Sequence, residues 1–231
     1  GAMSEALIDG RATIDKFIGD AIMAFWGAPR HNEEHATDAC RAALTCQRRF
    51  ADLQAEWMRR GLPAMNMRIG INTGRMVVGN IGSTDRLNYT VIGDSVNLAS
   101  RLEGLNNVYG TGILISQNTF ELAKYDIVAR KLDAVNVRGR EEAVAIYELL
   151  AMRDESGHAA GFEWVAVFER GISAYGDGRW HEASQHFQSV LEMRRDDAPA
   201  KLFLARCLER IAAEPKHPVL ASRRPGSSPS E

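Results

Sequence analysis

The sequence predicts an α/β domain that is followed by a small all-α unit. Up to about residue 151, short runs rich in β-branched and aromatic residues alternate with stretches whose apolar residues recur at helical spacing. After residue 160 the strand-type runs end and the helical spacing continues. We therefore expect a first domain over 1–151, a linker over 152–160, a helical segment over 161–213 and a disordered tail over 214–231.

Composition places the chain among soluble globular proteins. It has 231 residues, 45% apolar and 25% charged, and no apolar run approaches the roughly 18 residues that a membrane-spanning helix needs. The 28 basic and 30 acidic side chains nearly balance, so neither nucleic acid nor a lipid surface is a predicted partner. Cys40, Cys46 and Cys207 lack metal-ligand spacing and indicate buried thiols of a reducing compartment, so we expect a cytoplasmic protein.

The first part of the domain contains three predicted strands and one long helix. An alternating run over 17–26 predicts a single strand, and the apolar spacing over 35–60 predicts an amphipathic helix. Two further β-type runs, Met67–Asn72 and Arg75–Ile81, are separated by Thr73-Gly74, where glycine suits the positive φ of a tight turn. We therefore expect these two strands to form an antiparallel hairpin.

The second part of the domain continues with strands and a further helix. Leu87–Ile92 is typical of a strand, and Gly93 leads into a helix that Asp94 or Ser95 can cap. Later strands are expected over 112–115, 128–137 and 143–150, the last two joined through Arg138-Gly139-Arg140. Together these elements predict a sheet with helices on one side.

The C-terminal segment shows helical spacing only. Its small, aromatic and glycine residues resemble one tetratricopeptide repeat, in the order Trp164, Phe168, Gly171, Ala174, Gly178, Trp180, Ala183 and Phe187. A third helix is expected over 198–213. Because a single repeat cannot bury its apolar face alone, we expect it to pack on the first domain or on another copy, and to offer a surface to a protein partner.

Two pairs of polar residues suggest chemistry before any family is considered. Asn97 and Arg101 are four apart on the predicted helix, where an amide beside a guanidinium suits a sugar and a phosphate. The alternative is a solvated helix face on which Arg101 pairs with a neighbouring acid. Lys16 and Asp20 are spaced to share one side of a strand, and the alternative there is an edge-strand pair without a role.

Three motifs, in order and at matching spacing, resemble the catalytic domain of class III adenylate and guanylate cyclases. They are Lys16–Gly27, Arg68–Gly74 and Tyr89–Glu103. The resemblance covers about residues 10 to 150 of the chain. It implies a ferredoxin-like βαββαβ palm with appended strands.

The resemblance also implies a reaction, in which ATP is converted to 3′,5′-cyclic AMP and pyrophosphate by a two-metal mechanism. Asp20 matches one of the two carboxylates that hold a pair of Mg²⁺ or Mn²⁺ ions. Lys16 matches the residue that donates to adenine N1, and Thr90 stands where many adenylate cyclases carry Asp. A hydroxyl can accept from the adenine amino group, and Thr at this position is similar to the subgroup that includes the bicarbonate-responsive cyclases.

The ribose and phosphate contacts follow from the same resemblance. Asn97 matches the residue that orients the ribose, and Arg101 matches the one that stabilises charge on the α-phosphate. Arg138, with Arg140 close behind, is the residue expected to bind the terminal phosphates. In the family, Asp20 of one subunit works with the base, ribose and α-phosphate residues of the other. We therefore expect a homodimer with shared active sites.

One part of the family pattern has no counterpart in this chain. The first metal-binding Asp of the family lies in a strand of the type Phe-x-Asp-Ile-x-Gly-Phe, and the nineteen residues before Asp20 contain no such strand. Asp9 and Asp15 are nearby acids outside that motif. We therefore expect a palm that lacks its first strand, and weak or no activity for this chain. The sequence leaves open a truncation, a misassigned start and a naturally shortened homologue.

A second hypothesis of another class remains open. The chain can be a non-catalytic cyclase-homology module that dimerises or binds nucleotide and uses its helical repeat to engage protein. The missing Asp favours this alternative, whereas intact Lys16, Asp20, Asn97 and Arg101 favour an enzyme. A diguanylate cyclase is disfavoured because no Gly-Gly-acid-acid-Phe hairpin is present.

Overall fold

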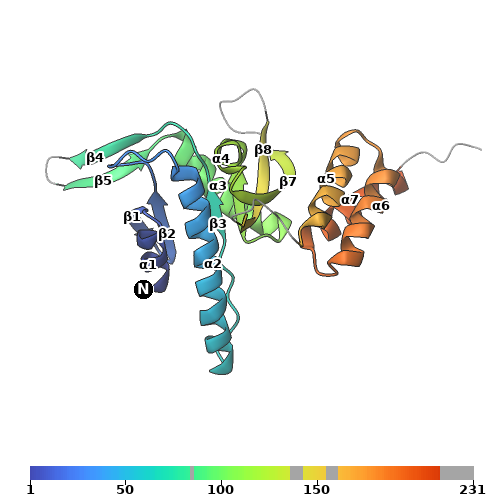
Figure 1. Cartoon of the computed structure of the whole chain (residues 1–231), viewed down its shortest axis with the longest axis horizontal. Helices are drawn as coiled ribbons and strands as arrows, with labels where there is room; N and C mark the ends of the chain where they lie inside the picture. Colours follow the sequence, from blue (N-terminus) through green and yellow to red (C-terminus); the bar gives the residue numbers. More distant parts are fainter. Residues whose placement is uncertain (84–85, 136–142, 155–160, 214–231) are drawn as a thin grey trace, which may run out of the picture.

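The computed structural model describes residues 1–83, 86–135, 143–154 and 161–213 of the chain. In chain order the elements are α1 (Ala2–Asp9), β1 (Thr13–Ile18), β2 (Ala21–Phe25), α2 (His35–Arg59), β3 (Ile69–Ile71), β4 (Val77–Ser83), β5 (Arg86–Ile92), α3 (Asp94–Tyr109), β6 (Ile113–Ser116), α4 (Gln117–Ala123), β7 (Ile127–Val135), β8 (Val144–Met152), α5 (Glu163–Gly176), α6 (Trp180–Met193) and α7 (Ala198–Ala213). Figure 1 shows β4 and β5 as an arm at the opposite end of the molecule from α5, α6 and α7. No helix in these described ranges is both long enough and apolar enough to cross a membrane.

The strand expected over 17–26 is a hairpin instead. The chain reverses at Gly19-Asp20, and β1 pairs antiparallel with β2, so that Ile18 faces Ala21. Gly19 has φ of 61°, which glycine adopts without steric cost. Asp20 therefore lies in the turn, and the expectation that it shares a strand face with Lys16 is wrong.

The antiparallel hairpin expected over 67–81 is also wrong, because β3 and β4 belong to different sheets. β3 pairs parallel with β6, whereas β4 pairs antiparallel with β5. Gly74 does not have a positive φ, and a Cβ placed on it would lie 2.3 Å from Ser95 Oγ. Glycine is needed at this position for the close approach of the loop to α3, and not for a tight turn.

The central sheet has the strand order β3-β6-β8-β7 and carries helices on both faces. Ile113 and Ile115 of β6 point into a core with α2 and α4, whereas Leu114 between them points into a core with α3 and the C-terminal helices. The expectation of helices on one side is therefore wrong. The alternation of side chains along β6 gives each face its own apolar layer, because successive residues of a strand point in opposite directions.

Glycine at position 70 lets α3 lie directly on β3. A Cβ on Gly70 would be 2.2 Å from the Ala99 carbonyl oxygen and 2.3 Å from the Glu103 nitrogen. The buried Asn106 side chain adds a tie between the same two elements, since its amide donates to the Ile69 carbonyl at 3.0 Å. The packing of α3 against β3 thus fixes the helix that carries Asn97 and Arg101.

We predict that Gly70→Ala lowers the free energy of unfolding by about 1 to 3 kcal/mol or more, because the added methyl overlaps the α3 backbone. Gly104→Ala on the same helix is the matched control, since its Cβ meets nothing within 4 Å. That control should stabilise the protein by up to about 1 kcal/mol through helix propensity. Urea unfolding of both variants measures the difference, and equal stabilities of the two variants would contradict the close contact.

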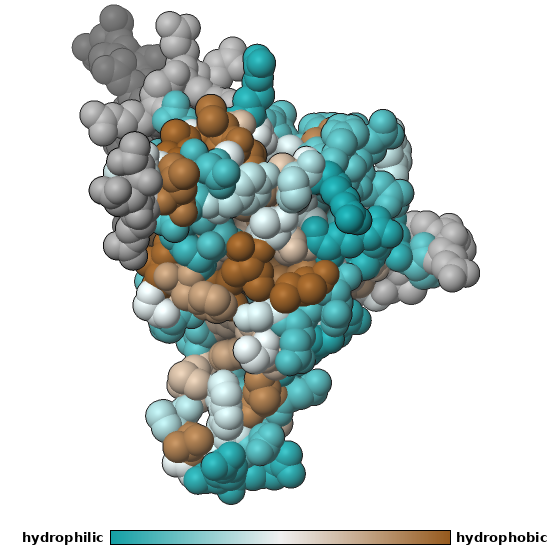
Figure 2. All heavy atoms as spheres, turned by 90° about the vertical axis from the view of Figure 1, so that its left-hand side faces the viewer, coloured by the Kyte–Doolittle hydropathy of each residue, from teal (hydrophilic) through white to brown (hydrophobic). Residues whose placement is uncertain are grey.

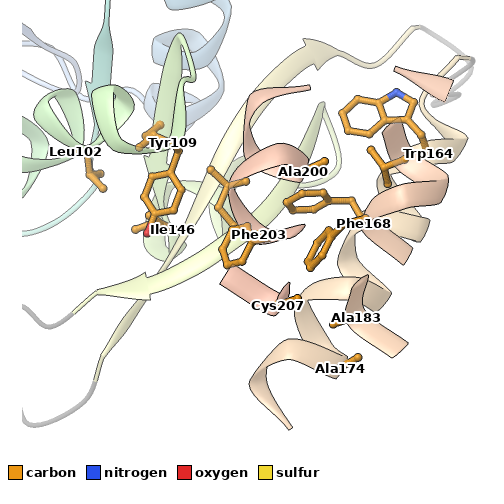
Figure 3. Close-up of a cluster of buried hydrophobic side chains, with 14 of the residues drawn as sticks. Leu102, Tyr109, Ile146, Trp164, Phe168, Ala174, Ala183, Ala200, Phe203 and Cys207 are labelled. Carbon is orange, nitrogen blue, oxygen red and sulfur yellow. The ribbon is translucent and has the colours of Figure 1, made fainter. Parts of the chain in front are cut away.

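The C-terminal helices pack on the first domain, which is one of the two arrangements that the sequence allows. Phe203 of α7 lies between Tyr109 of α3 and Phe168 of α5, with ring centroids 6.4 and 6.2 Å away (Figure 3). Gly171 faces the Phe187 ring so closely that a Cβ would be 2.7 Å from it. The apolar residues of the helices thus form one core with the sheet. The protein partner expected for this segment stays a prediction.

A buried arginine joins the C-terminal helices to the sheet. Arg130 on β7 has a side chain only 2% exposed, and it pairs with Glu148 on β8 at 2.6 Å and with Asp197 at 2.9 Å. Its guanidinium also lies 4.7 Å from the Trp164 ring and 4.4 Å from the Phe168 ring, both on α5. Asp197 in turn accepts from the Ala200 amide in the first turn of α7, so that one carboxylate caps the helix and binds the arginine.

The charge of Glu148 depends on the neighbouring Arg130 guanidinium. Burial raises the pKa of Glu148 above its usual range, and the Arg130 guanidinium beside it counteracts that rise. Removing the cation would leave two carboxylates that are largely withdrawn from water and lack their counter-charge. An uncompensated buried charge is far more destabilising than the intact pair is stabilising.

We predict that Arg130→Ala lowers the free energy of unfolding by about 3 to 5 kcal/mol, because it leaves Glu148 and Asp197 without their cation. Arg206→Ala is the control at the same interface. Arg206 pairs with Asp133 at 3.7 Å in a partly exposed position, and its loss should change the free energy by about 1 kcal/mol or less. Denaturant unfolding of the two variants compares them directly, and a small effect of Arg130→Ala would show that the buried cluster does not hold the two parts together.

Candidate functional site

Two of the predicted site residues, far apart in the sequence, meet where β1 lies against β5. Lys16 Nζ donates to Thr90 Oγ1 at 3.0 Å, although the residues are 74 positions apart. Thr90 is buried, whereas the Lys16 side chain is 46% exposed. The pair therefore presents an ammonium group at the surface beside a hydroxyl that is nearly withdrawn from solvent.

A third residue completes this contact. Thr90 Oγ1 donates to Asp15 Oδ2 at 2.7 Å, and Asp15 Oδ1 lies 3.5 Å from Lys16 Nζ. The Asp15 side chain is only 1% exposed. The ammonium, hydroxyl and carboxylate groups thus form a chain of hydrogen bonds that runs from Lys16 through Thr90 to Asp15. We refer to these three residues as the lysine–threonine–aspartate chain.

A β-bulge brings Asp15 and Lys16 to the same place. Ile14 pairs with Ala24 and Lys16 pairs with Met23, so Asp15 is an extra residue in β1 without a partner of its own in β2. In a regular strand, neighbouring side chains point to opposite faces, and a bulge re-aims one of them. The regular alternation of side chains along a strand predicts that Asp15 points to the face opposite Lys16. Sequence reasoning therefore misses the contact of Asp15 with Thr90.

Asn97 and Arg101 lie one turn apart on the exposed side of α3, as the spacing predicts. The helix begins directly after β5 at Gly93, which has φ of 148°. The expected cap by Asp94 or Ser95 is wrong, because no side chain caps this end. The Ser95 hydroxyl instead donates to the Arg75 carbonyl at 3.0 Å, which fixes the first turn of α3 against the loop before β4.

Position 20 and position 138 are the other two predicted site residues. Asp20 is exposed in the turn between β1 and β2. Arg138 lies outside the described residues. Within the described ranges, no group of three or more His, Cys, Asp or Glu side chains is placed to hold a metal ion. The described donors of this chain therefore do not fit the pair of divalent ions that the resemblance implies.

Apolar side chains gather on the face that carries β1, β4 and β5. Figure 2 shows hydrophobic patches among hydrophilic side chains on this side of the molecule. The large apolar residues that these strands expose by between 50% and 63% are Phe17, Ile18, Val77, Leu87 and Ile92. Exposed apolar side chains that gather on one face of a protein beside polar groups are typical of an interaction surface.

Residues 10–151 match the adenylate and guanylate cyclase catalytic domain, and the chain belongs to this family. It is 40% identical over 149 residues to adenylate cyclase 1 of Rhizobium meliloti, and this match covers 64% of this chain and 22% of the relative. It is 34% identical over 210 residues to the terminal-differentiation-specific adenylate cyclase of Dictyostelium discoideum, and this match covers 89% of this chain and 10% of the relative. The chain thus spans less than a quarter of the length of each of these two relatives. A match over 89% of the chain must also extend into the C-terminal helices.

Solved cyclase structures confirm the fold class. The adenylyl cyclase CyaB from P. aeruginosa is 36% identical, with a TM-score of 0.60, and the match covers 66% of this chain and 79% of that one. The guanylyl cyclase Cya2 is 34% identical, with a TM-score of 0.58, over 66% of this chain and 77% of that one. An adenylyl and a guanylyl cyclase match about equally well. The overall fold therefore does not distinguish the two bases, and any distinction depends on individual residues.

Proposed function

We propose that this chain is an adenylate cyclase catalytic domain, which converts ATP to 3′,5′-cyclic AMP and pyrophosphate. The observation that carries the proposal is the hydrogen bond between Lys16 and Thr90, the two residues that the resemblance assigns to the base. Their contact across 74 positions is what a common base-binding site requires. The names of the two relatives reported above, both adenylate cyclases, support the same choice.

The chemistry of the two side chains favours adenine. Adenine carries an acceptor at N1 and an amino donor at C6, whereas guanine carries a hydrogen on N1 and a carbonyl at C6. An ammonium group can only donate, and a hydroxyl can accept. Lys16 therefore matches adenine N1 and Thr90 matches the amino group, while guanine would meet a donor with a donor at N1.

The remaining residues suit phosphoryl chemistry on the bound nucleotide. In the reaction, the ribose 3′-oxygen attacks the α-phosphorus, its proton is lost, and the bond to pyrophosphate breaks. Asn97 would orient the ribose and Arg101 would stabilise the charge that develops on the α-phosphate, from one exposed face of α3. Arg138 would bind the leaving phosphates.

A homodimer with shared sites is part of this proposal. Asp20 lies in the β1–β2 turn, whereas Asn97 and Arg101 lie on α3, and the family builds each site from opposite subunits. The exposed apolar side chains of β1, β4 and β5 supply the kind of surface that such a dimer buries. ATP is the small-molecule partner of the dimer.

The metal pair is the incomplete part of the site. Mg²⁺ or Mn²⁺ ions would neutralise the triphosphate, and two of them need more carboxylates than Asp20 supplies among the described residues. We therefore expect this 231-residue chain by itself to be weak or inactive. The same observation supports the second candidate function, a non-catalytic module that dimerises or binds nucleotide.

The base assignment predicts the effect of Lys16→Glu. We define the lengthened protein as this chain extended upstream, so that it includes the first strand of the family with its metal-binding Asp and the two helices that the family places between that strand and the Lys16 strand. The lengthened protein should prefer ATP to GTP, and Lys16→Glu should reduce that preference by about tenfold to a hundredfold, because a matched hydrogen bond is lost. The ratio of kcat/KM for the two nucleotides measures it. Equal use of GTP and ATP by the unmutated lengthened protein would refute the assignment.

The shared site predicts rescue by mixing. Lengthened proteins with Asp20→Ala and with Asn97→Ala should each be inactive, and their mixture should regain up to about a quarter of the unmutated activity. Roughly half of randomly paired dimers are mixed, and each mixed dimer holds one site without a mutation. Cyclic AMP formation by the mixture measures the rescue, with sedimentation as the control for dimerisation. Two mutants that dimerise and stay inactive together would rule out the shared site.

A further inference from the structure

We propose that Asp15 determines purine specificity, because it fixes the direction of the Thr90 hydroxyl hydrogen. The proposal rests on the proposed function, in which Lys16 and Thr90 bind the base. It extends that function to a residue to which the cyclase motifs give no role. Its physical basis is the lysine–threonine–aspartate chain, in which each hydrogen bond has only one possible direction.

The direction of the chain follows from the donor and acceptor inventory of its members. An ammonium group has donors only, and an ionised carboxylate has acceptors only. Lys16 must therefore donate to Thr90, and Thr90 must donate to Asp15 Oδ2. The single hydrogen of the Thr90 hydroxyl is consumed by this second bond. What Thr90 can still offer to a ligand is a lone pair, so it acts as an acceptor only.

This constraint converts an ambiguous hydroxyl into a selective one. A free threonine hydroxyl can accept from the amino group of adenine, and it can equally rotate and donate to the carbonyl of guanine. With its hydrogen held by Asp15, Thr90 can satisfy only the amino group. A guanine carbonyl placed there would meet a lone pair, and a mismatched polar contact in a buried site discriminates strongly against the wrong ligand.

Burial and backbone geometry keep Asp15 in this role. Its side chain is 1% exposed, so water does not compete for the carboxylate. Asp15 Oδ1 lies 3.5 Å from Lys16 Nζ and has no hydrogen-bond partner in the part of the chain that the structure describes. The bulge at Asp15 aims the side chain at β5 rather than away from it. These features form a dedicated contact between two strands of separate sheets.

The opposing interpretation is that Asp15 only neutralises the charge of Lys16. Asp15→Asn separates the two, because the amide keeps the shape of the carboxylate. The ammonium group of Lys16 attracts the amide oxygen, which turns the amide nitrogen toward Thr90, where it donates to the hydroxyl oxygen. The Thr90 hydrogen is then free to bind guanine. Loss of a counter-charge alone would change the affinities for ATP and GTP together and leave their ratio unchanged.

The experiment is isothermal titration of the 231-residue chain with ATP and with GTP, and the result is the ratio of the two dissociation constants. We expect the unmutated chain to bind ATP more tightly, and Asp15→Asn to reduce the ratio by roughly tenfold. Thr90→Val should reduce it similarly, whereas Thr90→Ser, which keeps the hydroxyl, should preserve it. ATP and GTP are titrated separately into the same preparation of each variant. Partial unfolding therefore weakens both apparent affinities by the same factor and leaves their ratio unchanged.

Two controls decide the origin of any change. Asp9→Asn alters an exposed acid at the end of α1 that pairs with Arg49 of α2, and it should leave the ratio unchanged. In a Thr90→Val background, Asp15→Asn should have no further effect, since the hydroxyl it orients is absent. An unchanged ratio in Asp15→Asn, or a change that persists without the Thr90 hydroxyl, would overturn this proposal and leave the proposed function intact. An unmutated chain that binds ATP no more tightly than GTP would overturn both.

Discussion

The contact of Lys16 and Asp15 with Thr90 is the interaction on which the arrangement of the site depends. β1 and β2 form a sheet of their own, and no backbone ladder joins them to another strand among the described residues. Side chains hold the hairpin against β5, through the lysine–threonine–aspartate chain and through the Phe25 and Tyr89 rings, whose centroids are 6.2 Å apart. Because β5 leads directly into α3, this contact sets where Lys16 lies relative to the helix with Asn97 and Arg101.

The second constraint is the buried cluster around Arg130, which makes the C-terminal helices part of the catalytic domain's core. Arg130 and its acids lie on β7, on β8 and at the start of α7, and the apolar rings of α5 cover the guanidinium. Tyr109 at the end of α3 continues this core through Phe203. The helix that carries Asn97 and Arg101 is therefore packed between β3 and the C-terminal helices. The sequence match to the Dictyostelium relative also extends into these helices.

The sequence predicts the strongly periodic elements well and the turns poorly. The long helix α2 and the helix α3 both form where their apolar spacing indicates. The single strand expected over 17–26 and the hairpin expected over 67–81 were both wrong, because glycine has two uses in a chain and composition does not separate them. Gly19 supplies a positive φ at a true reversal, whereas Gly74 supplies room for Ser95. Only the tertiary neighbour of each glycine decides between these uses.

The candidate site could be predicted only in part, because the sequence does not show which side chains meet in the folded chain. Lys16 and Thr90 follow from family motifs, and their contact needed the fold to bring them together. Asp15 was beyond reach of sequence reasoning, because strand alternation turns it away from Lys16, and the register shift between β1 and β2 turns it back. Its contact with Thr90 depends on a local irregularity of the backbone, which neither propensity nor spacing encodes.

A cyclic AMP assay with ATP and Mn²⁺, run in parallel on the 231-residue chain and on the lengthened protein, tests the central claim most directly. We infer that this chain carries the residues for the base, the ribose and the α-phosphate, and that its described residues supply too few carboxylates for the metal pair. We therefore expect cyclic AMP from the lengthened protein and none above background from the 231-residue chain. Robust cyclic AMP formation by the 231-residue chain, or none by a folded and dimeric lengthened protein, would contradict it.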